Sequence, residues 1–165
     1  MDEIILKYSF SPGFMDDIIA KELLIFKNFD TRLEFFWYFD AGFFPDNDWQ
    51  RKQQRRCTKI RNILPQELQN QLVKLLESDL KIIEPEIIKT DKIIYATSAH
   101  PKSEYYKIKI GDEEKTIHIP YDIDKVLIEK AHKKIFLDFH YQLQTWIDQE
   151  FEVASEGKAV RFNKK

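Results

Sequence analysis

Two alternating runs on either side of a polar turn constrain the fold of this 165-residue chain more than any other feature. From Tyr105 to Ile119, tyrosine and isoleucine alternate with lysine, threonine and histidine across the turn Gly111-Asp112-Glu113-Glu114. Because successive side chains of a strand point to opposite faces, this pattern predicts a β-hairpin with one buried and one solvated face. The buried face needs a cover, so we expect an antiparallel sheet with other elements packed on one side.

The N-terminal part of the chain carries three more segments of extended character. Ile4–Phe10 and Thr31–Asp40 both alternate between two faces, with a turn sequence of Ser, Pro and Gly after the first. Ile18–Phe26 also has helical spacing behind a possible cap at Asp16, but its β-rich neighbours favour a strand. Together the three segments predict an antiparallel meander. The core-facing residues of its third strand are Leu33, Phe35, Trp37 and Phe39.

Apolar residues at helical spacing predict three helices. The first covers Trp49–Ile63, and Pro65 opens the second, Gln66–Ser78. The third and longest covers Ile123–Glu150, because two adjoining apolar stripes run along it. These stripes contain Ile128, Ala131, Ile135, Phe139 and Trp146, and Phe136, Leu143 and Ile147.

These elements predict an α+β fold in a single domain. We expect a mainly antiparallel sheet of about five or six strands, with helices packed on one face and a long C-terminal helix as the main core helix. The β-branched segment Ile87–Tyr95 predicts a further strand, and Ala41–Asp48 has the turn residues of a loop. The domain is expected to cover residues 1–151, followed by a polar C-terminal tail over residues 152–165.

Composition excludes several classes of protein. Hydrophobic residues make up 43% of the chain and charged residues 33%, which is the balance of a folded globular domain rather than a disordered one. The chain starts with acidic residues where a secretory signal would be basic, and no apolar run approaches the roughly 18 residues of a membrane span. Cys57 is the single cysteine, so an intrachain disulfide is impossible. We therefore expect a cytoplasmic protein that does not bind membranes.

A cluster of aromatic residues runs directly into a basic segment. Eight aromatic residues lie from Phe35 to Trp49, and Arg51–Arg61 follows with six basic residues and no acid. The remaining chain has 20 basic and 28 acidic residues, a net charge of −8, against −2 for the whole chain. An acidic molecule with one basic segment attracts an anionic patch at that segment and repels a long polyanion elsewhere.

This aromatic and basic junction is the best candidate for a contact surface. Aromatic and arginine side chains are enriched in the energetically dominant parts of protein interfaces. The predicted partner is another protein with an acidic patch. Nucleic acid is the alternative partner of the surface over residues 38–61, because bases stack on aromatic rings while basic groups hold phosphates. The predicted partner-binding residues are Tyr38, Phe43, Phe44, Trp49, Arg51, Lys52, Arg55, Arg56 and Lys59.

No assembled catalytic or metal-binding motif occurs in the sequence. His132 and His140 share a helical stripe but would lie about 12 Å apart, too far for one ion. We expect no metal, no cofactor and no enzymatic activity. The alternative is a small hydrolase in which two of the residues Asp40, Asp46 and Asp48 form an acid/base pair beside the aromatic loop. The simpler interpretation is that Asp46-Asn47-Asp48 turns the chain and caps the following helix.

The overall plan resembles that of small bacterial inhibitor and immunity proteins. The shared features are a meander, helices, a hairpin and a long C-terminal helix, with one cysteine and no active-site motif. Proteins of that kind are cytoplasmic and neutralise a toxic enzyme by direct contact. The resemblance is one of plan and composition over the whole chain, so it implies a function of this kind and assigns no residue a role.

Overall fold

The computed structural model describes residues 3–11, 20–40, 53–84 and 103–156, with the backbone alone at 38–40 and 53–56. The predicted loop Ala41–Asp48 and strand Ile87–Tyr95 lie outside these residues. The elements in chain order are β1 (Ile4–Ser11), β2 (Ala20–Phe26), β3 (Asp30–Asp40), β4 (Gln53–Ile63), α1 (Gln66–Glu77), β5 (Ser103–Ile110), β6 (Glu113–His118), the 3₁₀ turn η1 (Ile123–Lys125) and α2 (Lys130–Ser155).

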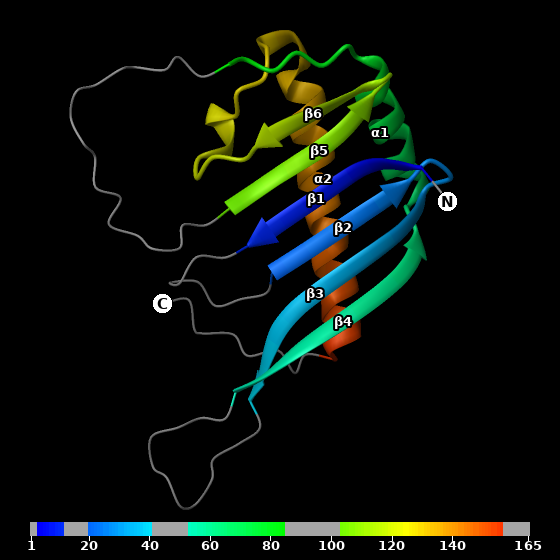
Figure 1. Ribbon diagram of the computed structural model, residues 1–165, viewed down its shortest axis with the longest axis vertical. Coiled ribbons are helices and arrows are strands. Elements are labelled where there is room, and N and C mark those ends of the chain that lie inside the picture. The colour runs from blue at the N-terminus through cyan, green and yellow to red at the C-terminus, as the bar shows by residue number, and fades with distance from the viewer. Residues whose placement is uncertain (1–2, 12–19, 41–52, 85–102, 157–165) are drawn as a thin grey trace, which may run out of the picture.

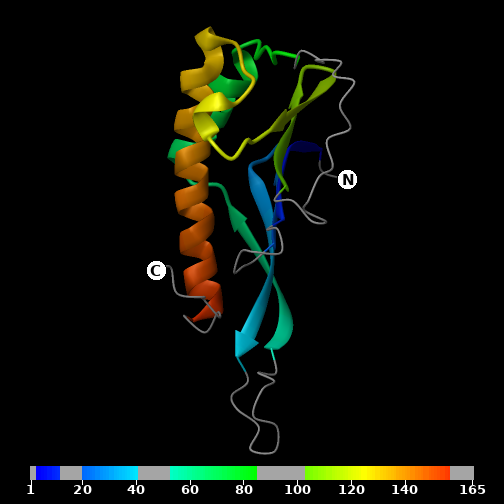
Figure 2. The same cartoon turned by 90° about the vertical axis from the view of Figure 1, so that its left-hand side faces the viewer.

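One six-stranded antiparallel sheet forms one layer of the molecule, and the helices form the other. The strand order is β4-β3-β2-β1-β5-β6, so every strand neighbours the next one in the chain except that β5 returns beside β1. Figure 1 shows α2 running behind the sheet across its strands, and Figure 2 shows both helices on the same side of the sheet. The predicted α+β fold, with its helices on one face and its long C-terminal helix, is confirmed.

The core lies between the sheet and the two helices, and α1 contributes Leu68, Leu72 and Leu75 to it. Alternate residues of the strands point into it, and the predicted core residues Leu33, Phe35 and Trp37 are buried. The apolar face of α2 meets them: the ring of Phe151 lies 4.8 Å from that of Phe35 and 6.0 Å from that of Trp37. The wide apolar face predicted for the long helix is confirmed by its buried residues. These are Phe136, Phe139, His140, Leu143, Trp146, Ile147, Phe151 and Ser155.

The predicted hairpin is present as β5 and β6, with a shorter turn than expected. Ile110 pairs with Glu113, so Gly111 and Asp112 are the two residues of the loop. Gly111 has a φ of 60°, a backbone conformation that favours glycine and that matches the twist of a two-residue hairpin loop. The strands Ile4–Ser11 and Asp30–Asp40 and the helix Gln66–Glu77 also confirm the predicted elements at those places.

The helix predicted over Trp49–Ile63 is wrong, because residues 53–63 form strand β4. This strand pairs with β3 along its whole length, from Asp40 opposite Gln53 to Asp30 opposite Ile63. The apolar residues that suggested helical spacing divide differently in a strand, where Ile60 points toward the core and Cys57 is exposed. Basic residues four positions apart repel one another on a helix, whereas a strand separates them along its length.

The long helix begins at Lys130 rather than at Ile123. The segment before it is extended, because Ile128 bridges Ile82 and the amide of Ile83 donates to the carbonyl of Leu127 at 3.0 Å. Val126 and Ile128 are buried in this extended form. Pairing with a distant segment therefore outweighs the helical spacing of these residues.

The same helix extends past its predicted end at Glu150. It ends at Ser155, and Glu156 follows in the left-handed region with a φ of 51°. Phe151 packs on Phe35 and Trp37 of β3 and Ser155 is buried, so packing stabilises this last part of the helix. Residues 157–165, the remainder of the predicted tail, lie outside the described part of the chain.

Candidate functional site

One face of the sheet has no helix packed on it within the described part of the chain. We call it the open face (Figures 1 and 2). It consists of the strand positions that alternate with the buried ones, and strand register places these positions in rows across the sheet. Within the described part of the chain, this face leaves side chains of all six strands available for contact with another molecule.

A row of basic residues crosses the open face from β5 to β4. Lys107 lies directly opposite Lys7, Lys7 opposite Leu24, Leu24 opposite Arg32, and Arg32 opposite Arg61. We call the four charged members, Lys107, Lys7, Arg32 and Arg61, the basic row. Like charges at directly opposed positions destabilise a sheet unless neighbouring acids relieve them.

Acidic residues in the neighbouring rows compensate the charges of three of the four residues of the basic row. The Lys7 ammonium lies 2.5 Å from Glu22, the Lys107 ammonium 3.1 Å from Glu114, and Nη2 of Arg32 2.6 Å from Glu34. The hydrogen bond to Glu22 raises the pKa of the Lys7 ammonium above its usual range, although partial burial acts against the charge.

The carboxylate of Glu34 forms ion pairs with two basic residues. One is Arg32, and the other is Lys59 of β4, whose ammonium lies 3.3 Å from the same carboxylate oxygen. Partial burial works against the charged form of Glu34, but the hydrogen bonds from Arg32 and Lys59 outweigh it and hold the pKa of this carboxyl below its usual range. Arg61 makes no ion pair within the described part of the chain, so its charge is the least compensated of the basic row.

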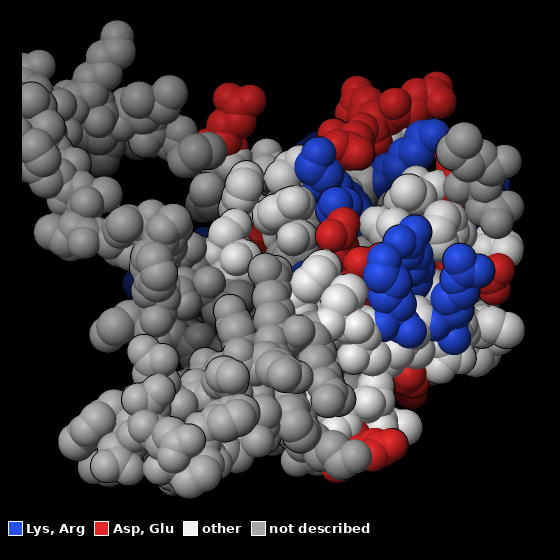
Figure 3. Space-filling view, turned by 60° about the horizontal axis from the view of Figure 1, so that its bottom comes forward, with Lys and Arg blue, Asp and Glu red and all other residues white. Residues whose placement is uncertain are grey.

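The open face is more positive than the molecule as a whole. Its described side chains include six basic and four acidic residues, an excess of two positive charges in a chain of net charge −2. Seen from the β4 side, Figure 3 shows blue basic side chains gathered beside red acidic ones. The six basic residues are Lys7, Arg32, Lys59, Arg61, Lys107 and Lys109, and the four acidic residues are Glu22, Asp30, Glu34 and Glu114.

A pocket of about 440 Å³ lies at one end of the open face, where β2 and β4 end and β3 begins. It is a partly open depression of the surface rather than an enclosed cavity. Arg32 and Arg61 lie at directly opposed strand positions, and Asp30 and Ile63 form the next such pair on the same face. Its lining residues are Phe26, Asp30, Thr31, Arg32, Arg61, Asn62 and Ile63.

The predicted partner-binding residues fall into three groups in the structure. Phe43, Phe44, Trp49, Arg51 and Lys52 lie outside the described residues. The backbones of Tyr38, Arg55 and Arg56 lie in β3 and β4, where Tyr38 is directly opposite Arg55. Lys59 is exposed on the open face and pairs with Glu34.

Sequence reasoning missed most of the basic row. Lys7, Arg32 and Lys107 come from three different strands that are far apart in the chain, and the pairing of those strands brings them into one line. The sequence did show basic residues at the solvent-facing positions of the predicted strands. Their alignment into one row depends on the strand order, which includes the long-range pairing of β1 with β5.

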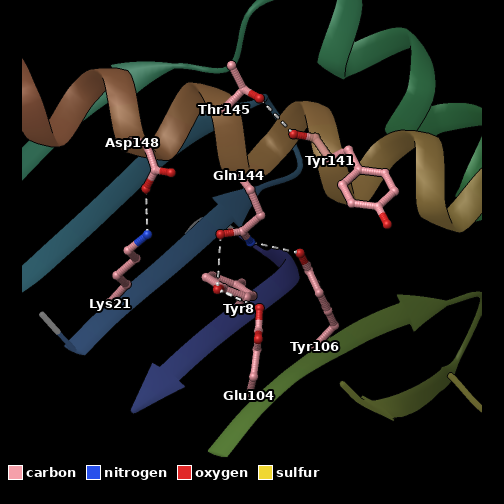
Figure 4. A network of polar contacts seen from close by, with 8 residues as sticks. All are labelled: Tyr8, Lys21, Glu104, Tyr106, Tyr141, Gln144, Thr145 and Asp148. Carbon is pink, nitrogen blue, oxygen red and sulfur yellow. Dashed lines mark hydrogen bonds and ion pairs between the residues drawn. The ribbon is translucent and has the colours of Figure 1, made fainter. Parts of the chain in front are cut away.

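A second polar cluster lies inside the molecule, between the sheet and α2 (Figure 4). The hydroxyl of Tyr8 donates to Glu104 at 2.9 Å and lies 3.3 Å from Oε1 of Gln144, whose amide nitrogen donates to the hydroxyl of Tyr106 at 3.3 Å. Tyr106 in turn lies 2.8 Å from Nδ1 of His140.

The chemistry of this cluster suits a structural role. Burial raises the pKa of the Tyr8 and Tyr106 hydroxyls above their usual range, so both remain protonated donors at neutral pH. Each hydroxyl has hydrogen-bond partners from α2. Directional bonds of this kind set the position of the helix over the sheet.

Residues 3–11, 20–40, 53–84 and 103–156 hold no group of three or more His, Cys, Asp or Glu side chains that could bind a metal ion. Neither α1 nor α2 combines the length and the apolar composition needed to cross a membrane. Of the aspartates in the hydrolase alternative, Asp46 and Asp48 lie outside the described residues, and Asp40 is described by its backbone in β3.

Comparison with known proteins found no family model, no curated protein and no solved structure that matches this chain.

Proposed function

We propose that this protein is a non-enzymatic, cytoplasmic binding protein that uses the open face of its sheet to contact an acidic surface of another protein. Its plan favours an immunity-type inhibitor that neutralises a toxic enzyme by direct contact. The observation that carries the proposal is the basic row, which crosses a sheet face without a helical cover in the described part of the chain.

The charges of the basic row are only partly compensated within the described part of the chain. Its two like-charge pairs, Lys7 with Lys107 and Arg32 with Arg61, occupy directly opposed positions. Glutamates pair with Lys7, Lys107 and Arg32, so the repulsion that remains is centred on Arg61, and an acidic partner surface would compensate it. Electrostatic attraction of this kind mainly accelerates association.

The basic residues of strand β4 have an alternative role that does not involve binding. It forms one edge of the sheet, and basic residues on an edge strand prevent edge-to-edge aggregation. This protective role accounts for Lys59 and Arg61 at the edge. It does not account for Lys7 on β1, which lies between two other strands in the interior of the sheet.

The test is affinity capture followed by kinetics with the recovered partner. Wild-type protein is compared with Lys7/Lys59/Lys107→Glu on the open face and with Lys74/Lys130/Lys134→Glu on the helical layer, a control with the same change in charge. The open-face variant should associate with the purified partner at least about tenfold more slowly, and the control less than about twofold. The recovered partner should be an enzyme whose activity the wild-type protein abolishes. Equal association by both variants would overturn the role of the open face.

The same proteins distinguish nucleic acid from protein as the partner. Several phosphate contacts would make affinity for RNA or DNA fall steeply between about 50 and 200 mM salt. We expect no such binding, because acidic residues lie among the basic ones on the open face and the chain is acidic overall. Tight, salt-sensitive binding of a random oligonucleotide would replace the protein-binding proposal with a nucleic-acid one.

A further inference from the structure

The pocket at the end of the open face combines a basic wall with an apolar one. The basic wall is formed by Arg32 and Arg61. The apolar wall includes Phe26 and Ile63, and Ile63 has 62% of its surface exposed. Ile4 lies opposite Phe26 on β1 and is 44% exposed, so it extends the apolar wall beyond the pocket. Large exposed isoleucines beside an uncompensated charge favour contact with a ligand that is itself part acidic and part apolar.

The two arginines differ in how much of their hydrogen-bonding capacity is used. Nε of Arg32 donates to Glu34 at 2.9 Å and Nη2 lies 2.6 Å from the same oxygen, so one side of this guanidinium is occupied. Glu34 is also shared with Lys59, and Arg61 makes no ion pair within the described residues. A guanidinium has five N–H donors in a planar fork that matches the two oxygens of a carboxylate. The pocket therefore offers one free fork and part of a second.

Asp30 limits which anion the pocket can accept. It lines the pocket, and its carboxylate accepts the side-chain amide of Asn28 at 2.7 Å. Asp30 is directly opposite Ile63 and two positions from Arg32 on the same face of β3, so its carboxylate lies next to both the isoleucine and the arginines. Asp30 therefore repels a dianion more strongly than it repels a single carboxylate, and a carboxylate with an apolar neighbour can place its charge on Arg61 and its apolar part against Ile63.

We infer that this pocket binds a carboxylate side chain, together with an adjacent apolar side chain, from an acidic segment of the partner protein. The inference rests on the proposed function in taking the ligand to be part of a protein. Arg61 binds the carboxylate, Arg32 supplies the second cationic group, and Ile63 and Phe26 hold the apolar neighbour. Lys59 and Lys107 contribute to the field of the open face without lining the pocket.

The experiment uses peptide probes and NMR of the full-length protein. The probes are acetyl-Leu-Glu-Leu-Glu-Leu-amide, the same peptide with Gln in place of Glu, and inorganic phosphate, each titrated into the millimolar range. Signals of the arginine Nε–H groups and of the isoleucine methyl groups are followed. The acidic peptide should give saturable shifts at Arg61 and Ile63, while the Gln peptide and phosphate should bind at least about tenfold more weakly.

Two substitutions separate the pocket from the general charge of the face. Arg61→Gln should weaken the acidic peptide about tenfold, whereas Lys107→Gln, the same loss of charge at the other end of the basic row, should change it less than about twofold. Equal effects of the two variants, absence of saturable shifts at Arg61, or phosphate binding as tight as that of the acidic peptide would each overturn the inference. Failure of the proposed function would be seen in a different experiment, because the variant Lys7/Lys59/Lys107→Glu that tests it leaves Arg32 and Arg61 unchanged.

Discussion

The hydroxyl oxygen of Tyr106 lies 2.8 Å from Nδ1 of His140, and this contact joins the middle of β5 to the middle of α2. The side-chain amide of Gln144 donates to the same hydroxyl at 3.3 Å, so the phenol hydrogen remains for the bond to His140. Both Tyr106 and His140 are buried. The position of the long helix over the sheet is thus determined by directional hydrogen bonds as well as by apolar packing.

Removal of this hydroxyl should destabilise the protein. Tyr106→Phe keeps the ring and its packing but removes the group that joins Gln144 to His140, which should lower the free energy of unfolding by about 1–3 kcal/mol. Urea denaturation measures the change. Tyr105→Phe, on the neighbouring residue of the open face, is the control and should change the stability by less than about 0.5 kcal/mol. A Tyr106→Phe variant as stable as wild type would contradict a structural role for the cluster.

Truncation of the apolar face of α2 should cost more. Phe139 is 0% exposed and Trp146 is 8% exposed, so replacing either with alanine leaves a cavity between the helix and the sheet. We expect Phe139→Ala and Trp146→Ala each to lower the free energy of unfolding by about 3–5 kcal/mol. Thermal melting of Val153→Ala, at a position that is 79% exposed on the same helix, is the control. Wild-type melting temperatures in both core variants would contradict the packing of α2.

Strand β4 can be tested through one hydrogen bond that a helix at these residues would not make. The indole nitrogen of Trp37 donates to the hydroxyl of Thr58 at 2.9 Å across the β3–β4 pair. Thr58→Val keeps the shape and removes the acceptor, so the stability should fall by about 1 kcal/mol and the fluorescence of Trp37 should change. Thr116→Val on the open face is the matched control. No effect on either stability or fluorescence would argue against this pairing.

The ion pairs of Glu34 predict a dependence of stability on pH. Because the pKa of Glu34 is held below its usual value of 4.5, its stabilising effect is fully present above that value and is lost as the pH falls through the lower pKa of the folded state. Glu34→Gln should lower the free energy of unfolding at neutral pH by about 0.5–1 kcal/mol and should reduce the loss of stability on acidification. Unfolding curves from pH 7 down to about pH 3 measure both effects. If the variant lost as much stability on acidification as the wild type, Glu34 would not contribute to the pH dependence of stability.

Local patterns were sufficient for several elements of this fold. The alternation around Gly111, the alternation of Leu33, Phe35 and Trp37, and the wide apolar face of the last helix each predicted the observed element and its buried side. The aromatic and basic junction was also visible in the sequence. One of its residues, Lys59, has a described side chain, which is exposed on the open face, and its role in binding remains a prediction.

The tertiary structure decided the features in which distant segments meet. Residues 53–63 became a strand because the whole length of β3 was available to pair with them, and Ile128 stayed extended because residues 81–83 pair with its neighbours. The basic row and the pocket arose in the same way, from the register of β5, β1, β2, β3 and β4. A sequence determines the period and polarity of each segment, since these depend on adjacent residues. Pairing between strands depends on which partners are close in space, so the chain specifies it through the fold as a whole.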